Sequence, residues 1–377
     1  MTNTIRHLFS ISVSAVILAA CGGSGSDVSV PPPPPIVVVE EQETLSETLD
    51  VFLEANIDDN APGLSVLLIK DNEVVYRNAK GMANSETGLA IQSDTGFRLA
   101  SVSKTFTAVA IMHLFEQQLI SLDDSILMYL PELPESWGDI SIHHLLSHRS
   151  GIVDYFNDFK FNDFPLRAEE NVLTNQDILE YFTANAALEF TPGSKGEYSN
   201  SGFVMLAEII SRVSGISFAE YIDIHVFQPL GMHNSYIADE QTDLRTDDAL
   251  NFAELETQFN KRFYVTGSQS QVSSLDDLEK FIVGMLDHQI LTSDTFDLMA
   301  TNYSDLEHLG STYGYGMQID KDNPMAFGHG GGFDGFRTKV LIRMDQNWHL
   351  VVLSNGGDVT GARIDPIAEL VANFYAE

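Results

Sequence analysis

A serine and a lysine lie three residues apart in FRLASVSKTFTAVAIM, the stretch from Phe97 to Met112. On a helix, residues three apart share a face, so the Ser101 hydroxyl and the Lys104 amine can meet. A serine hydroxyl is a weak nucleophile until a base accepts its proton. Lysine can do so only if its pKa falls well below about 10.4, and an apolar setting lowers it. The uncharged run that follows Lys104 provides that setting.

A phenol and a carboxamide stand together in Tyr198-Ser199-Asn200. This segment follows the turn-forming sequence TPGS and precedes an amphipathic helical pattern that begins near Gly202. A phenol can relay a proton, and a carboxamide can hold a substrate carbonyl. Taken alone, such a segment is most often only a turn.

A third feature is the glycine-rich run GHGGGF, residues 328–333, which lies before a predicted strand near Phe336 to Arg343. Glycines let a substrate approach the backbone closely and leave N–H groups available to an oxyanion. A glycine-rich turn between two strands is the alternative interpretation.

In this order the three features resemble the S-x-x-K, Y-x-N and K-T-G or H-x-G motifs of the serine β-lactamase and penicillin-binding-protein superfamily. They are most similar to class C β-lactamases, D-alanyl-D-alanine carboxypeptidases, D-aminopeptidases and β-lactamase-like esterases. The connecting segments FR before the serine, LISLDD after its helix and HLLSHRSG further on are also similar to that group. The resemblance runs from about Leu45 to the C-terminus.

The resemblance implies catalytic roles for three residues. Ser101 is the expected acylated nucleophile, and Lys104 and Tyr198 are expected to handle its proton. Either of the latter two could be the acylation base, and the sequence leaves this open. Asn200 is expected to orient the amide or ester of the substrate.

The third motif is expected to bind substrate through His329, Gly331 and Gly332. His329 takes the position that lysine holds elsewhere, and the N–H groups of Ser101 and Gly332 would form the oxyanion hole. Gly330 departs from the pattern, because a threonine hydroxyl that helps to bind a substrate carboxylate is missing there. Efficient β-lactam hydrolysis is therefore not expected, whereas ester or D-amino-acid peptide hydrolysis stays open. Arg337 could replace the carboxylate contact, although a surface arginine on a strand is the simpler interpretation.

We therefore expect a serine hydrolase that acts through an acyl-enzyme on a small-molecule or peptide substrate, without a cofactor. A D-Ala-D-Ala carboxypeptidase-like peptidase and an esterase are the favoured activities, and a class C-like β-lactamase is the alternative. A non-catalytic lipoprotein that binds cell-wall peptides is an alternative of another class. An inactive copy would be expected to lose the serine, lysine or tyrosine, and this chain keeps all three. The oligomeric state is not predicted.

Histidines at 143, 144 and 148 raise the possibility of a metal site, because His144 and His148 are four residues apart. The zinc-protease pattern requires glutamate directly after the first histidine, and Leu145 stands there. Helix packing near the site is therefore the preferred interpretation, and no metal ligands are predicted.

Strand patterns at the two ends of the sequence enclose a long helical middle. LSVLLIK and EVVYRNAKG predict a hairpin that turns at Asp71-Asn72, and FRTKVLIRM and HLVVLSN predict late strands. Between them, capping hydroxyls paired with acidic residues predict helix starts at Thr174, Ser217 and Ser274. The expected fold is α/β of the α+β type, β-lactamase/transpeptidase-like. An antiparallel sheet is built from N- and C-terminal strands, flanked by helices, and a mainly helical lobe is inserted.

The N-terminus has the features of a lipoprotein signal. A short apolar run follows Arg6 and His7 and ends in LAAC, which resembles a bacterial lipobox with Cys21 as the lipid attachment site. We expect a signal peptide at residues 1–20, an anchor and proline-rich linker at 21–44, and the hydrolase domain at 45–377. The expected location is the outer membrane facing the periplasm, because Gly22 rather than aspartate follows the cysteine. The lipid would be the only contact with the membrane.

The charge balance excludes one class of partner. The 377 residues include 54 acidic and 20 basic side chains, a formal net charge of −34. Such a chain repels nucleic acid, so no nucleic-acid role is expected.

Overall fold

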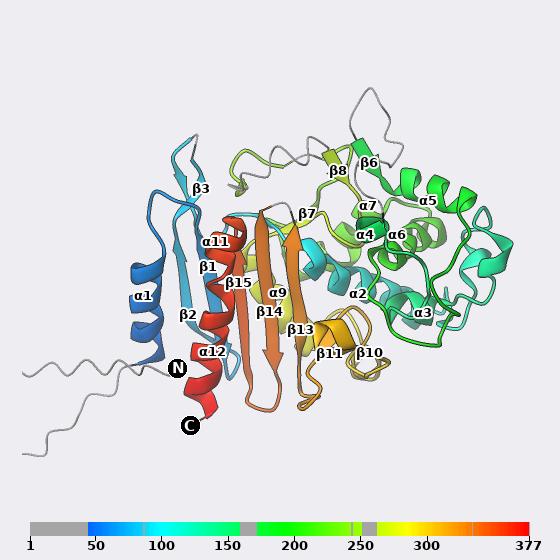
Figure 1. Ribbon diagram of the computed structural model, residues 1–377. Helices are drawn as coiled ribbons and strands as arrows, with labels where there is room; N and C mark the ends of the chain where they lie inside the picture. The colour runs from blue at the N-terminus through cyan, green and yellow to red at the C-terminus, as the bar shows by residue number, and fades with distance from the viewer. Residues whose placement is uncertain are drawn as a thin grey trace, which may run out of the picture. The chain divides into compact units, whose positions relative to one another are not determined.

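Figure 1 shows the chain as a computed structural model, which describes residues 44–85, 87–158, 172–242, 244–250, 262–333 and 335–376. The predicted signal peptide lies outside these ranges, and so does the predicted linker apart from Thr44. Within the described ranges no single helix is long and apolar enough to cross a bilayer, and one bent pair, Asn200–Ser214 with Phe218–Leu230, meets that criterion together.

An antiparallel sheet of eight strands organises the domain, and its strand order joins the two ends of the sequence. Strand β1 pairs with β2 on one side and with β15, the last strand of the chain, on the other, and β15 in turn pairs with β14. In spatial order the strands are β10 (Ser304–Leu306), β11 (Ser311–Tyr313), β12 (Gln318–Ile319), β13 (Ala326–Phe333), β14 (Phe336–Arg343), β15 (Trp348–Ser354), β1 (Leu64–Lys70) and β2 (Glu73–Lys80). The predicted sheet of N- and C-terminal strands is confirmed.

The β1–β2 hairpin turns where the sequence predicted it. Asp71 and Asn72 have φ values of 52° and 65°. Positive φ at both central residues is what a two-residue hairpin turn of the favoured hand requires, and Asp and Asn tolerate it well.

Alternate side chains of β1 enter two different cores, as the period of two in a strand requires. Leu64, Val66 and Leu68 pack with helices α1 (Leu45–Asn56) and α12 (Ile364–Ala376) on one face of the sheet. Leu67 and Ile69 belong to the larger core on the other face. That core also contains side chains of α2 (Ser103–Glu116), α9 (Leu275–Leu286) and α10 (Ser293–Met299).

The middle of the chain forms the predicted helical lobe. The capped starts at Thr174, Ser217 and Ser274 are confirmed, because each immediately precedes a helix. The lobe and its connections comprise η2 (Ile126–Met128), η3 (Glu135–Trp137), α3 (Ile142–Leu146), α4 (Tyr155–Asp158), α5 (Asn175–Ala184), α6 (Asn200–Ser214), α7 (Phe218–Ile222), the π-helix η4 (Asp223–Phe227) and α8 (Gln228–Leu230).

Short elements complete the domain. They are β3 (Met82–Asn84), β4 (Leu89–Ala90), β5 (Phe97–Arg98), η1 (Ala100–Val102), β6 (Val172–Thr174), β7 (Tyr236–Ile237), β8 (Arg262–Tyr264), β9 (Gln271–Ser273), η6 (Glu307–Leu309) and α11 (Gly357–Gly361). Strand β9 pairs with both β5 and β7, which places it directly beside the segment that leads to Ser101.

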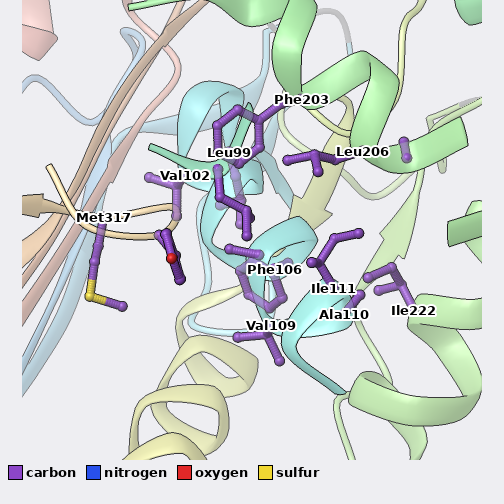
Figure 2. Packing of buried hydrophobic residues seen from close by; sticks show 14 of the residues in the cluster. Leu99, Val102, Phe106, Val109, Ala110, Ile111, Phe203, Leu206, Ile222 and Met317 are labelled. Atoms are coloured by element: carbon purple, nitrogen blue, oxygen red, sulfur yellow. The ribbon is translucent and has the colours of Figure 1, made fainter. Parts of the chain in front are cut away.

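Helix α2 crosses the centre of the larger core. Figure 2 shows its side chains, Phe106, Val109 and Ile111 among them, together with Phe203 and Leu206 of α6 and Ile222 of α7. Phe106 also stacks on Phe281 of α9 with 3.8 Å between ring centroids. A helix that is apolar on all sides is a core helix, so a lysine in its first turn is buried by its position.

Candidate active site

Ser101 sits in η1, the single 3-10 turn that leads into α2, and its side chain is partly exposed. Neighbouring strands hold this turn in place. The Leu99 N–H donates to the Gln271 carbonyl at 2.8 Å, and the Thr338 hydroxyl donates to the Leu99 carbonyl at 2.8 Å. Ala100 has a φ of 49°, a left-handed conformation that costs a non-glycine residue energy. The tertiary bonds around the turn therefore hold Ser101 in a constrained position.

Lys104 reaches Ser101 as the three-residue spacing predicted. Its side chain is 0% exposed, and its Nζ donates to Ser101 Oγ at 3.1 Å. It also donates to Asn200 Oδ1 at 2.7 Å and to the Ser268 carbonyl at 2.9 Å. An ammonium has three donors, so these three acceptors satisfy it completely.

The same three contacts direct the amine when it loses a proton. A neutral amine keeps two N–H donors and gains one lone pair. The Asn200 and Ser268 oxygens can only accept, so they retain the two N–H groups. The lone pair then faces Ser101, whose hydroxyl can donate, and this is the arrangement that a general base needs.

Burial lowers the pKa of Lys104 to about 7, because the apolar surroundings disfavour the ammonium. The Asp154 carboxylate opposes this shift by favouring the charged form of the lysine. Both protonation states of Lys104 are therefore accessible near neutral pH.

Tyr198 contacts both the nucleophile and the lysine. Burial raises its pKa, and a side-chain hydrogen bond with Ser101 opposes that rise. The Lys104 ammonium lies 4.9 Å from the centre of the Tyr198 ring. The structure thus brings together Ser101, Lys104, Tyr198 and Asn200. Helix α6 begins at Asn200, two residues before Gly202, so Asn200 lies in its first turn.

His148 contacts the Tyr198-Ser199-Asn200 segment. Its Nδ1 accepts the Ser199 N–H at 3.2 Å, and its ring packs on Tyr198 and Tyr313 at centroid distances of 4.3 and 4.4 Å. The sequence indicated helix packing near the site for this histidine. The structure confirms the packing, but α3 ends at Leu146, so His148 lies beyond the helix, with a φ of 58°, and does not share a helical face with His144. Among the described residues there is no group of three or more His, Cys, Asp or Glu side chains arranged to hold a metal.

His329 is neutral in this arrangement. Its Nδ1 lies 2.6 Å from the Gly330 carbonyl, which can only accept, so Nδ1 carries the proton. Its Nε2 then accepts the Tyr313 hydroxyl at 2.9 Å. Burial, aided by the Lys104 charge, lowers the pKa of His329 to about 3. A lysine at this position would supply a positive charge that His329 does not.

The third motif is a strand, not a turn before one. Residues 326–333 form β13, and all eight pair with β14. A Cβ atom on Gly331 would lie 2.3 Å from the Leu99 carbonyl oxygen, so glycine lets β13 pack against the Ser101 turn. Gly332 pairs with Arg337, whose guanidinium is bound to Asp358 at 2.6 Å. This salt bridge and the partial exposure of Arg337 agree with the surface interpretation.

Three contributors were not found from the sequence. Asp154 binds the Asn200 carboxamide, the Ser268 carbonyl binds Lys104, and Tyr313 binds His329. No spacing pattern links these positions to Ser101, and a backbone carbonyl leaves no signal in the residue types.

The chain belongs to the Beta-lactamase family, whose family model matches residues 45–373. It is therefore related to hydrolases of the β-lactamase fold.

Particular relatives agree with this class. The chain is 29% identical to a penicillin-binding protein of Bacillus subtilis (strain 168) over 318 residues, which cover 77% of this chain and 67% of the relative. It is 28% identical to a D-aminopeptidase of Gluconobacter oxydans (strain 621H), covering 78% of this chain and 56% of that protein. The crystal structure of a penicillin-binding protein from Bacillus halodurans superposes with a TM-score of 0.72 at 26% identity, covering 85% of this chain and 98% of the other.

Proposed function

We propose that this chain is a serine hydrolase that forms an acyl-enzyme at Ser101 with an amide or ester substrate. The observation that carries the proposal is the buried Lys104 amine in contact with Ser101 Oγ, with two acceptor-only oxygens as its other partners. Membership of a hydrolase family supports it.

In the proposed reaction, the Ser101 hydroxyl gives its proton to Lys104 or Tyr198 as Oγ bonds to the substrate carbonyl carbon. Backbone N–H groups at Ser101 and Gly332 would stabilise the oxyanion. The bond to the amine or alcohol then breaks, and the leaving group takes up the proton that Lys104 or Tyr198 accepted, which restores that group to its starting state. Water repeats these steps on the acyl-enzyme and releases the acid.

Two features of β13 bear on the substrate. His329 is neutral, and Gly330 has no hydroxyl, so this strand lacks two groups that could bind a carboxylate. This favours esters and D-aminoacyl amides over substrates that carry a carboxylate beside the reacting bond. D-Ala-D-Ala peptides remain the peptidase alternative, and β-lactams, as for a class C-like enzyme, come after both.

Mass spectrometry of the intact protein tests the proposal. It would be incubated separately with a p-nitrophenyl ester, a D-aminoacyl amide, a D-Ala-D-Ala peptide and nitrocefin. We expect an acyl adduct with the ester or the aminoacyl amide, and none in Ser101→Ala. The matched control is Ser103→Ala, which removes the neighbouring hydroxyl that accepts the Gln271 N–H.

An adduct that persists in Ser101→Ala would contradict the assignment of the nucleophile. The non-catalytic lipoprotein would be favoured instead if the protein binds a cell-wall peptide but forms no adduct with any compound of the panel and none with a fluorophosphonate.

We also propose that the protein is exported and anchored through a lipid on Cys21, on the outer membrane facing the periplasm. The lipobox-like sequence LAAC supports this proposal.

A further inference from the structure

A buried carboxylate stands behind Asn200, on the side away from Lys104. Asp154 is 7% exposed and follows α3 in the connection to α4. Its Oδ2 accepts the Asn200 side-chain Nδ2 at 2.9 Å, and its Oδ1 accepts the Asn200 backbone N–H at 3.2 Å. The Phe156 N–H adds a further donor at 3.1 Å. These hydrogen bonds favour the charged form of the carboxylate and oppose the effect of burial, which raises the pKa of Asp154.

The segment that carries Asp154 is fastened to the start of α6. The Ser201 hydroxyl donates to the Val153 carbonyl at 2.7 Å and accepts the Tyr155 N–H at 2.9 Å. The Ser199 hydroxyl donates to the Ile152 carbonyl at 3.2 Å. These bonds lie on both sides of Asp154 and Asn200, so the two side chains are held in register.

This contact decides which way the Asn200 carboxamide faces. A carboxylate can only accept and an ammonium can only donate. The amide nitrogen must therefore point to Asp154 and the amide oxygen to Lys104, as observed. With the oxygen fixed there, a deprotonated Lys104 keeps one N–H on Asn200 and turns its lone pair toward Ser101.

The same contact sets the charge balance of the site. The titratable groups around Lys104 are Asp154 from the segment after α3, Tyr155 of α4, Tyr198 before α6 and His329 of β13. His329 is neutral, and burial raises the pKa of both tyrosines. Asp154 is thus the carboxylate that can balance the Lys104 ammonium. Each charge favours the other, because the ammonium opposes the rise in the Asp154 pKa that burial causes and the carboxylate opposes the fall in the Lys104 pKa.

We propose that Asp154 is a positioning residue and counter-ion for Lys104, acting through the Asn200 carboxamide to fix the lysine's orientation and its ionisation. The inference rests on the proposed acyl-enzyme function.

The pH dependence of acylation tests this role without requiring the natural substrate. The second-order rate of labelling by a fluorophosphonate, which phosphonylates the serine and releases fluoride, would be measured across pH for the wild type and Asp154→Asn. Removing the negative charge of Asp154 disfavours the Lys104 ammonium and lowers its pKa. The limb of the rate–pH profile that reflects the ionisation of Lys104 should therefore shift to lower pH by about one unit. The Asn200 amide also loses its fixed orientation, so the maximal rate should fall on the order of tenfold.

The limb that moves also identifies the base. If neutral Lys104 accepts the serine proton, the ascending limb moves to lower pH. If the ammonium is required while Tyr198 accepts the proton, the descending limb moves to lower pH. Either shift supports the proposal, and a profile whose limbs both stay in place overturns it, even if labelling is slower.

Two controls separate this outcome from misfolding and from failure of the proposed function. Asp177→Asn removes another buried carboxylate, one that caps α5 through Thr174, and should leave the profile unchanged. Asp154→Ser, whose hydroxyl can still accept the Asn200 N–H, replaces Asp154→Asn if the latter does not fold, and the same shift is expected. The proposed function is refuted if the wild type is not labelled, or if Ser101→Ala is labelled as well. If the wild type is labelled at Ser101 and Asp154→Asn leaves both limbs of the pH profile in place, only the role of Asp154 is refuted.

Discussion

At the scale of single residues, Lys104 lies in a core helix, where three protein oxygens take the place of the water that would solvate its ammonium. A buried ammonium loses its solvation by water, which favours the neutral amine. Each fixed hydrogen-bond acceptor compensates part of the lost solvation free energy. Lys104 has one acceptor from its own turn, one from α6 and one from the backbone at Ser268. Three separate segments must therefore be in place before the amine is positioned.

Gly330 offers a direct test of substrate choice. A Cβ there would meet only the Thr338 carbonyl oxygen, at 3.9 Å, so a larger side chain has room. In Gly330→Thr the new hydroxyl can donate to a substrate carboxylate. We expect acylation by a D-Ala-D-Ala peptide to rise about tenfold relative to the same peptide with an amidated C-terminus, since a hydrogen bond to a charged group contributes about 1.5–3 kcal/mol. The rate of adduct formation is measured with each of the two peptides, and the ratio of these rates is compared between Gly330→Thr and the wild type.

Gly330→Val is the matched control, because valine has nearly the shape of threonine without the hydroxyl. It should leave the ratio between the two peptides as in the wild type. An equal rise in both variants would mean that side-chain bulk, rather than the hydroxyl, changes the preference.

The residues of the site were predictable only where the information was local. Ser101 and Lys104 share a helical turn, so their spacing alone predicted contact. Asp154 and Tyr313 reach the site through tertiary structure, and nothing in their own neighbourhood distinguishes them from ordinary polar residues. The neutral state of His329 also depends on its burial in the folded protein, where its Nε2 accepts a hydrogen bond from Tyr313 of another strand.

At the scale of elements, the close approach of β13 to η1 sets the width of the site. In Gly331→Ala the new methyl group would meet the Leu99 carbonyl oxygen and Thr338 Oγ1, both at 2.3 Å. Strand β13 would have to move away from the Ser101 turn. We expect a loss of stability of about 1–3 kcal/mol, as for other overpacked sites, together with much slower fluorophosphonate labelling. Thermal unfolding and labelling rates measure the two effects.

Gly330→Ala is the control in the same strand, since its methyl group would meet only the Thr338 carbonyl oxygen, at an ordinary contact distance of 3.9 Å. It should unfold and label as the wild type does. If Gly331→Ala also behaves as the wild type, close packing of β13 on η1 does not position the nucleophile.

Elements were predictable to the extent that their ends carry local signals. Helix α5 begins after Thr174, whose capping box with Asp177 was recognisable in the sequence. Strand β13 was not recognised, because four of its eight residues are glycine, which has little tendency to form strands. Pairing with β14 along its whole length, rather than its own composition, makes it a strand.

At the scale of the whole molecule, the proposed anchor would attach an acidic hydrolase domain to a membrane through residues 21–44. Cys21 is the only cysteine in the chain, so attachment of a lipid can be followed without interference from other thiols. In a bacterial host supplied with labelled palmitate, we expect the wild type to incorporate label and partition with membranes. Cys21→Ala should incorporate none. Ser24→Ala, the nearby control, should keep the label, and label that persists in Cys21→Ala would exclude this site.

Stability toward acid depends in part on a histidine inside the sheet. His349 of β15 is 1% exposed, neither of its ring nitrogens has a hydrogen-bond partner among the described residues, and burial lowers its pKa to about 4. In the unfolded chain its pKa is about 6.5, so the unfolded state binds the proton first as pH falls. This group therefore has no effect on the pH dependence above about 6.5 and destabilises the fold progressively between pH 6.5 and 4.

His349→Val should remove that contribution, since valine fits a buried strand and carries no proton. We expect the free energy of unfolding of the variant, relative to the wild type, to increase by on the order of 2 kcal/mol between pH 7 and pH 4. Denaturant unfolding at each pH measures the difference, which cancels the effect of the many carboxylates that both proteins share. The exposed His233→Val is the control and should show a constant difference. A constant difference for His349→Val as well would mean that His349 finds solvent or a partner when it is protonated.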